Sequence, residues 1–156
     1  MSKKDEFKFP KVLLVAPQHD SKKYCWDIWR DRVKNLTYPN FDVYIADNSE
    51  TDEFSKEIKA DGFICERVGY KIKSVLERTT KAHEACRLYA INRGYDYIFH
   101  LETDVIPPLD VIERLLTQNK QVISGVYDIF HGKSRKAMIQ TIEPLDRTVR
   151  AFRSCL

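Results

Sequence analysis

The stretch YDYIFHLETDVIPPLDVIERLL, residues 95–116, contains an apolar strand that runs directly into two carboxylates. Residues 97–101 form the apolar run, and Glu102 and Asp104 follow it with one residue between them. Burying an ionised carboxylate is costly unless it has a partner, a hydrogen-bond network or a metal. The stretch therefore indicates a strand end at which the two carboxylates have a partner, a hydrogen-bond network or a metal.

Around this stretch, apolar runs of strand length alternate with segments of helical period, which is typical of an α/β fold. The run at residues 11–17 is continuously apolar, as in strands that are buried on both faces of a parallel sheet. We predict strands at residues 11–17, 41–46, 62–68, 96–101 and 120–127, and helices at about residues 21–36, 51–59, 80–93 and after 108. The order predicts a Rossmann-type sandwich with a mostly parallel central sheet and helices on both faces.

The ends of these elements carry their own signals. Ser21 is expected to cap the first helix, and Pro107-Pro108 suits a helix start, where a missing N–H does no harm. Residues 136–142 and 148–154 predict two further strands, which we expect to be antiparallel because only a turn separates them. The carboxyl-terminal end is therefore predicted to be rich in β-structure.

Length and composition exclude several classes of protein. A chain of 156 residues, of which 43% are hydrophobic and 31% charged, predicts one globular domain without a membrane-spanning segment. A net charge of +3 with both signs interspersed does not indicate a nucleic-acid partner. The four cysteines form no CxxC pair, and no signal peptide is recognisable, so we expect reduced thiols and a cytoplasmic protein.

Polar clusters follow three of the predicted strands, at residues 17–20, 47–52 and 102–104. In open parallel sheets, ligands bind outside the carboxyl ends of the strands. The coincidence of the three clusters therefore predicts one ligand site at this edge.

Glu102 and Asp104 are the candidate metal ligands. On an extended segment, side chains two residues apart point the same way, so both acids could converge on one hard cation. Mg²⁺ or Mn²⁺ held by one or two carboxylates keeps positions that substrate phosphates fill. The alternative is that one acid caps the following helix while the other is solvated.

Three further residues are candidates for contacts with a nucleotide. Asp47 could accept hydrogen bonds from a ribose hydroxyl or a base N–H, or it could belong to a turn that caps the next helix. Arg78 and Lys81 lie close to a predicted helix N-terminus capped by Thr79 or Thr80, which would favour an anion. Solvated basic side chains are the alternative for this pair.

The order of these motifs resembles the GT-A nucleotide-sugar glycosyltransferases, especially the family-2-like group. The motifs are KVLLVAP, then VYIADNSETD, then an alanine-containing helix, then HLETDVIPP, and finally VISGVY. The resemblance covers about residues 10–128 and implies a GT-A fold with a metal-binding acid-x-acid motif at Glu102 and Asp104. It also implies that Asp47 contacts the nucleoside. The donor-binding residues predicted in this way are Pro17, His19, Asp47, Arg78, Lys81 and Thr103.

The resemblance implies a hexosyltransferase that uses Mn²⁺ or Mg²⁺ and a UDP- or GDP-linked sugar, with a sugar, lipid or protein as acceptor. The metal-binding acid is Glu at the first position, where the family more often has Asp. Asp128 is the best-placed acid for a catalytic base, and inverting and retaining chemistry both stay open. We expect one GT-A-like domain over residues 1–156, with an extension at 1–10, a nucleotide-sugar-binding part at 11–128 and a partial acceptor side at 129–156, in a minimal enzyme or a fragment.

Two alternatives come from other classes of protein. A nucleotidyltransferase also needs metal and phosphate contacts, but the first strand and its loop, KVLLVAPQHD, contain no glycine to cradle a phosphate. A non-catalytic module that binds a nucleotide sugar would need no acceptor half. Donor hydrolysis distinguishes a binding module from a transferase.

Overall fold

The structure is a computed structural model of the whole chain. Contacts between Cα atoms divide it into two compact units, Met1–Gln18 with Pro39–His100 and His19–Tyr38 with Leu101–Leu156. The residues that the structure describes are 9–125, 127–131, 134–137 and 152–154.

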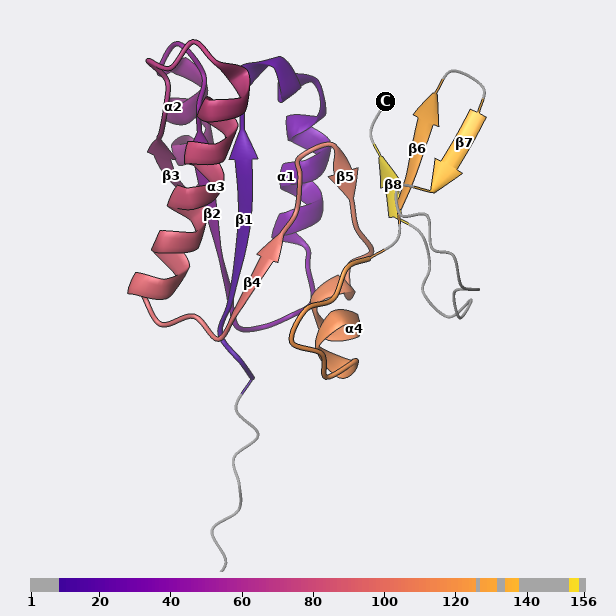
Figure 1. Cartoon of the computed structure of the whole chain (residues 1–156). Helices are drawn as coiled ribbons and strands as arrows, with labels where there is room; N and C mark the ends of the chain where they lie inside the picture. The colour runs from indigo at the N-terminus through magenta and orange to yellow at the C-terminus, as the bar shows by residue number, and fades with distance from the viewer. Residues whose placement is uncertain (1–8, 126, 132–133, 138–151, 155–156) are drawn as a thin grey trace, which may run out of the picture. The chain divides into compact units, whose positions relative to one another are not determined.

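The first unit contains a four-stranded, all-parallel sheet (Figure 1). Its strands are β1 (Val12–Gln18), β2 (Phe41–Asp47), β3 (Ile64–Arg67) and β4 (Tyr97–His100), in the order β3-β2-β1-β4. Every residue of β1 is buried, because this strand lies between β2 and β4 and both of its faces are covered. The first four predicted strands are confirmed with small shifts of their ends. The α/β class is consistent with a Rossmann-like fold.

Two helices of the first unit flank the sheet, α2 (Glu53–Ala60) and α3 (Val75–Asn92). The small residues Ala82, Cys86 and Ala90 of α3 pack on the side of the sheet that carries Leu13 and Tyr44. Tyr89 of α3 stacks on Tyr44 with ring centroids 4.1 Å apart. These contacts form a core between α3 and the sheet, and Figure 1 shows α3 lying over the sheet beside β2 and β3.

The helix α3 begins five residues earlier than predicted. Ser74 is its N-cap and accepts a hydrogen bond from the Glu77 backbone N–H at 3.4 Å. Thr80 lies inside the helix, where its hydroxyl donates to the Leu76 carbonyl oxygen at 2.8 Å. The predicted cap at Thr79 or Thr80 is therefore wrong, because an earlier serine supplies the capping oxygen.

The second unit begins with a 3₁₀ helix, η1 (Asp20–Cys25), which continues into α1 (Trp26–Lys34). The predicted cap at Ser21 is wrong, because His19 is the N-cap and its Nδ1 accepts from the Ser21 N–H at 3.2 Å. The stacked rings of Trp26 and Trp29 are fully buried. The other elements of this unit are β5 (Val105–Ile106), α4 (Val111–Thr117), β6 (Tyr127–His131), β7 (Ser134–Ala137) and β8 (Phe152–Ser154).

The predicted strand at residues 120–127 is wrong, since residues 120–125 form no strand and β6 begins at Tyr127. Val122 is 91% exposed and Ile123 is 39% exposed. β-Propensity expresses how well a side chain packs on a paired, half-buried sheet surface. Val122 and Ile123 have no such surface to pack on. The strand forms instead where β6 pairs with β7 and β8.

The two last predicted strands are also placed differently. In the second sheet the order is β5-β8-β6-β7, so β6 separates β7 from β8. The prediction at 136–142 shares residues 136–137 with β7 and the prediction at 148–154 shares residues 152–154 with β8, while residues 138–151 lie outside the described residues. The antiparallel partner of β7 is β6, which precedes it in the chain.

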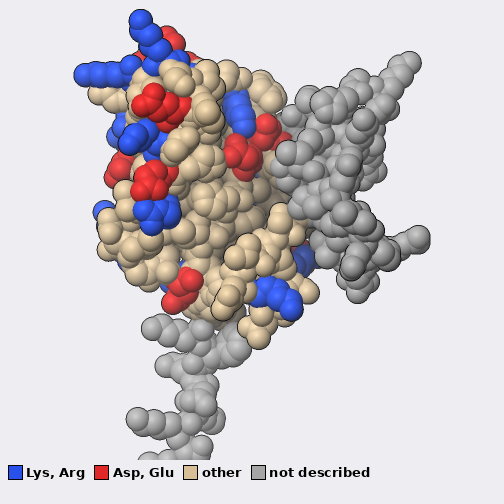
Figure 2. All heavy atoms as spheres, in the orientation of Figure 1, with Lys and Arg blue, Asp and Glu red and all other residues tan. Residues whose placement is uncertain are grey.

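Two surface properties bear on function. Among the described residues, no helix combines the length and the apolar character needed to cross a bilayer. Figure 2 shows acidic and basic side chains interspersed on the visible face rather than gathered by sign. This mixed surface agrees with the small net charge of +3.

Candidate functional site

The two acids Glu102 and Asp104 lie in a turn of the second unit. The Val105 backbone N–H donates to the Glu102 carbonyl oxygen at 3.0 Å, so the segment bends where we expected it to be extended. Thr103 between them is fully buried, whereas the side chains of Glu102 and Asp104 are 40% and 32% exposed. The turn therefore buries the central residue and leaves both carboxylates accessible.

Both carboxylates contact one cation, the ammonium group of Lys22. Lys22 Nζ donates to Glu102 Oε2 at 2.8 Å and lies 3.3 Å from Asp104 Oδ2. Burial lowers the pKa of Lys22, but the hydrogen bond and the charge of Glu102, together with Asp104, leave that pKa above its usual value. The acids thus converge on one positive charge.

The alternative that one of these acids caps the following helix does not hold. The N-cap residue of α4 is Asp110, whose carboxylate pairs with Arg114 at 2.7 Å. Two other hydrogen bonds hold the loop before α4. Arg32 donates to the Pro107 carbonyl oxygen at 3.0 Å, and the Thr37 N–H donates to the Leu109 carbonyl oxygen at 3.0 Å. Pro107-Pro108 therefore belongs to an anchored loop, and α4 begins three residues after Pro108.

The acid pair fits a hard divalent cation. Glu102 and Asp104 supply oxygen ligands that already surround a positive charge, and both remain partly exposed. Across the described ranges, no group of three or more His, Cys, Asp or Glu side chains has a geometry that could hold a metal ion. A set of two carboxylates matches the sparse protein ligation of Mg²⁺, whose other positions go to water and phosphate.

Asp47 ends β2 in the first unit and is fully buried. Its Oδ1 accepts from both the backbone N–H of Ser49, at 3.1 Å, and the Ser49 hydroxyl. The N-cap residue of α2 is Asp52, at the end of the 47–52 cluster, so this cluster does lead into that helix, but Asp47 is not the capping residue. The neighbouring Asn48 is also buried, and its Oδ1 makes no hydrogen bond within the part of the chain that the structure describes. A ligand N–H or O–H would satisfy this acceptor.

Arg67 holds the same loop in place, and the sequence analysis missed it. Arg67 lies at the end of β3 and donates to the carbonyl oxygens of Ser49 and Glu50 at 3.0 and 2.9 Å. Its guanidinium also lies 4.0 Å from the ring centroid of Tyr70. A signal was present, since a charged residue ended a strand beside the acidic cluster at 47–52, but its partners lie 17 and 18 residues away.

Arg78 lies in the first turn of α3 and Lys81 lies about one turn further on, so the helix N-terminus expected at Thr79 or Thr80 stands earlier, at Ser74. Both residues lie beside Gly69 in the loop that follows β3. A Cβ at Gly69 would lie 3.4 Å from the Arg78 carbonyl oxygen and 3.5 Å from Lys81 Cβ, and the φ of +70° also favours glycine there. Val68, just before Gly69, donates its N–H to the Asp47 carbonyl oxygen at 2.8 Å. The two basic residues therefore adjoin the loop that meets the end of β2.

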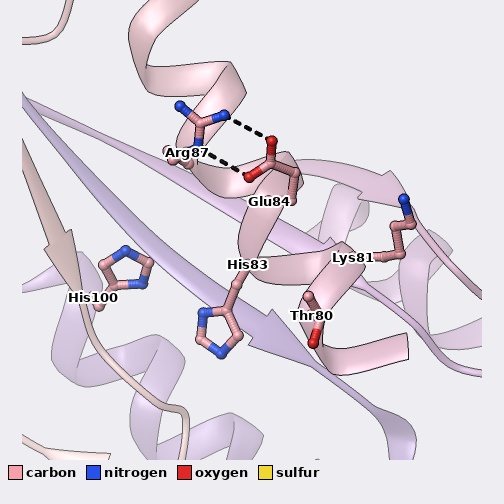
Figure 3. Close-up of a pocket in the computed structure, with 6 residues that line it drawn as sticks. All are labelled: Thr80, Lys81, His83, Glu84, Arg87 and His100. Atoms are coloured by element: carbon pink, nitrogen blue, oxygen red, sulfur yellow. Dashed lines mark hydrogen bonds and ion pairs between the residues drawn. The ribbon is translucent and has the colours of Figure 1, made fainter. Parts of the chain in front are cut away.

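Lys81 also lines an open cavity of about 550 Å³ between α3 and the end of β4 (Figure 3). His83 and His100 face one another there, with ring centroids 5.7 Å apart. Glu84 forms two hydrogen bonds with Arg87 at 2.9 and 2.7 Å. No role was predicted for these histidines, although Thr80, His83, Glu84 and Arg87 have the spacing of one helix face.

The remaining predicted residues are placed as follows. Pro17 is buried in β1 opposite Ala46, and His19 caps η1. Thr103 is buried inside the acid turn. Asp128 lies in β6 opposite Ala137 and Arg153 in the register of the second sheet. The structure thus brings Glu102 and Asp104 together around Lys22, while Asp47, Arg78 and Lys81 are linked through the loop after β3.

No protein-family model matches the chain, and no curated protein matches it.

Proposed function

We propose that this chain is a metal-dependent glycosyltransferase of GT-A type, which moves a sugar from a nucleotide-diphosphate donor to an acceptor hydroxyl. The observation that carries the proposal is the convergence of Glu102 and Asp104 on the single cation Lys22 directly after a strand of a parallel sheet. The β3-β2-β1-β4 order also supports it, because ligands of such sheets bind beyond the carboxyl ends of the strands.

In this proposal Glu102 and Asp104 hold Mn²⁺ or Mg²⁺, and the bound ion would neutralise charge on the leaving diphosphate. Asp47 and Asn48 accept hydrogen bonds from the nucleoside in this proposal, which is supported by the Asn48 Oδ1 atom that has no hydrogen-bond partner among the described residues and by Arg67, which binds the carbonyl oxygens of Ser49 and Glu50 in the same loop. Arg78 and Lys81 add positive charge beside that loop. The chain's own task is mainly to position the donor and to stabilise charge.

The finer assignments belong to the same proposal. The donor carries UDP or GDP, Pro17, His19 and Thr103 contribute to its binding, and Asp128 is the proposed base. The cytoplasm is the proposed compartment, which is supported by the buried cysteines Cys25, Cys65 and Cys86 of the described residues, none of which is in a disulfide.

The test is a thermal-shift series with UDP and GDP, each in Mn²⁺ and in EDTA. At a ligand concentration about 100-fold above the dissociation constant, binding should add about 2.7 kcal/mol to the free energy of unfolding. For a chain of this size the melting temperature should rise by roughly 5 to 10 °C, and only with metal. Equal shifts in Mn²⁺ and EDTA would remove the metal from the proposal.

Enzyme and binding module are separated by donor hydrolysis. A transferase without acceptor passes some donor sugar to water, so nucleoside diphosphate should accumulate slowly from a UDP- or GDP-sugar. A variant that lacks Asp104 is the matched control. A chain that binds the donor but leaves it intact over the same period is a binding module.

A further inference from the structure

Lys22 reaches the acid pair from a distant part of the chain, 80 residues before Glu102. Its backbone is fixed within η1, because its N–H donates to the His19 carbonyl oxygen at 2.9 Å and its own carbonyl accepts from Cys25 Sγ at 3.1 Å. Cys25 is buried. The starting point of the lysine side chain is therefore rigid, while its four-carbon stem leaves the ammonium group room to move.

The ammonium and a divalent ion need the same place. Lys22 Nζ lies within 3.3 Å of an oxygen from each acid, which is where an ion bound by both carboxylates would also have to lie. Two cations at such short range repel each other. A metal can bind both acids only after the ammonium has left.

The ion pairs are of the exchangeable kind. The side chains of Lys22, Glu102 and Asp104 are 33%, 40% and 32% exposed, so water can solvate each group when the pairs open. Partly exposed ion pairs are individually weak. A divalent ion attracts the two carboxylates more strongly than a single ammonium charge does, so it can replace Lys22 at modest cost.

We propose that Lys22 is an internal counter-ion that occupies the acid pair in the metal-free chain and is displaced from it when a divalent metal binds. The proposal rests on the proposed function, because it concerns the same two acids. It explains how two neighbouring carboxylates coexist in the metal-free chain without strong repulsion. It also makes Lys22 a regulator of metal affinity, since metal binds only to the fraction of molecules in which the ammonium is out of the way.

The experiment titrates Mn²⁺ alone, without nucleotide, into the parent chain and into Lys22→Met, and follows free Mn²⁺ by electron paramagnetic resonance. Methionine keeps the length and apolar stem of lysine but removes the competing charge. We expect Lys22→Met to bind Mn²⁺ about tenfold more tightly than the parent chain does. This factor corresponds to an ammonium group that contacts the acids in about nine-tenths of the parent molecules. Lys22→Arg, which keeps the charge, should bind Mn²⁺ no more tightly than the parent chain.

Two controls make the result specific to this site. Lys23→Met removes the same charge from the next residue in η1 and should change Mn²⁺ affinity by less than about twofold, because an exposed charge is screened. The double variant Lys22→Met/Asp104→Ala should lose the gain. A gain that persists in the double variant would mean that Mn²⁺ binds elsewhere and would overturn the proposal.

Unchanged or weaker Mn²⁺ binding by Lys22→Met would also overturn it, since a competitor cannot be removed without effect. Melting curves in EDTA identify a misfolded variant, and Lys22→Gln then serves as the second test. A separate titration of UDP or GDP with Mn²⁺ tests the proposed function. If the nucleotide binds the parent chain while Lys22→Met leaves Mn²⁺ affinity unchanged, only the role of Lys22 fails.

Discussion

The carboxylate at the end of β2 and the two carboxylates after β4 have different kinds of partner. Asp47 is fully buried, and its Oδ1 is held by the backbone and hydroxyl of Ser49, two residues away. Glu102 and Asp104 remain about one-third to two-fifths exposed and share Lys22, about 80 residues away. The first acid is held by local hydrogen bonds in a buried turn, whereas the second pair forms partly exposed ion pairs with a distant lysine.

This difference predicts different effects of mutation. A buried acid with local hydrogen bonds contributes to folding as well as to any ligand that it contacts. A partly exposed acid pair can lose a member with little cost to folding, because its ion pairs with Lys22 are weak and water can solvate what remains. Stability and binding should therefore respond together at Asp47 and separately at Asp104.

The largest effect is expected from Asp104→Ala, which should weaken Mn²⁺-dependent binding of UDP or GDP by at least about 100-fold. Glu102→Ala should weaken it less, because the longer glutamate can act through water and its loss leaves the shorter, less mobile ligand in place. Isothermal titration measures the affinity, and a melting curve should show an unchanged fold. Glu84→Ala removes an exposed acid elsewhere and is the control. If Asp104→Ala binds like the parent chain but melts far lower, the acid is structural.

Asp47→Asn comes next, with an expected loss of roughly 10- to 150-fold in nucleoside diphosphate affinity, because a charged acceptor is replaced by a neutral one. The remaining binding should still require Mn²⁺. Unlike Asp104→Ala, this change should also lower the free energy of unfolding, which urea denaturation measures. Lower stability with unchanged affinity would assign Asp47 a purely structural role.

Ser49→Ala tests how much the buried Asp47 turn contributes to stability, and it leaves the carboxylate itself in place. It removes the hydroxyl that donates to Asp47 Oδ1 but keeps the backbone N–H that also donates there. We expect the free energy of unfolding to fall by about 1 to 3 kcal/mol, measured by urea denaturation. Ser124→Ala removes an exposed hydroxyl and should stay within about 0.5 kcal/mol of the parent chain. A similar value for both variants would mean that the Asp47 turn adds nothing to stability.

The smallest effect concerns pH. Burial first, and then the charge of Asp47, raise the pKa of the Cys65 thiol to about 12 from its ordinary 9.0, although Lys59 opposes the rise. Because the folded pKa is the higher one, this stabilisation is complete below pH 9 and is lost as pH rises towards 12. Between pH 8 and pH 10 the thiol should account for a fall of about 1 kcal/mol in the free energy of unfolding.

Urea denaturation at several pH values measures that fall. Cys65→Ala should show a shallower dependence on pH than the parent chain, whatever its absolute stability. Tyr44 keeps a share of the dependence in both proteins, because burial and then Glu66 raise its pKa above the usual value. The same slope for Cys65→Ala and the parent chain would contradict the assignment to the thiol.

Local pattern was sufficient for the strands of the first sheet and for the acids at their ends. The runs that became β1 and β2 are apolar over most of their length, and burial between neighbouring strands requires that composition. Helix ends were less predictable, because Ser74 competes with Thr79 and Thr80 as a cap and local chemistry favours all three. Residues 120–125 failed as a strand for a related reason, since a strand needs a partner that its own residues do not specify.

The sequence by itself determined the α/β class, the parallel order of apolar runs and the presence of acids after β2 and β4. Only the tertiary structure decided what satisfies those acids. Lys22 meets Glu102 across 80 residues of chain, and Arg67 reaches the carbonyl oxygens of Ser49 and Glu50 from a neighbouring strand. Hydrophobic periodicity operates over a few residues and can be recognised in a sequence. The choice of a charged partner depends on which segments folding brings within about 4 Å, and no local pattern encodes that distance.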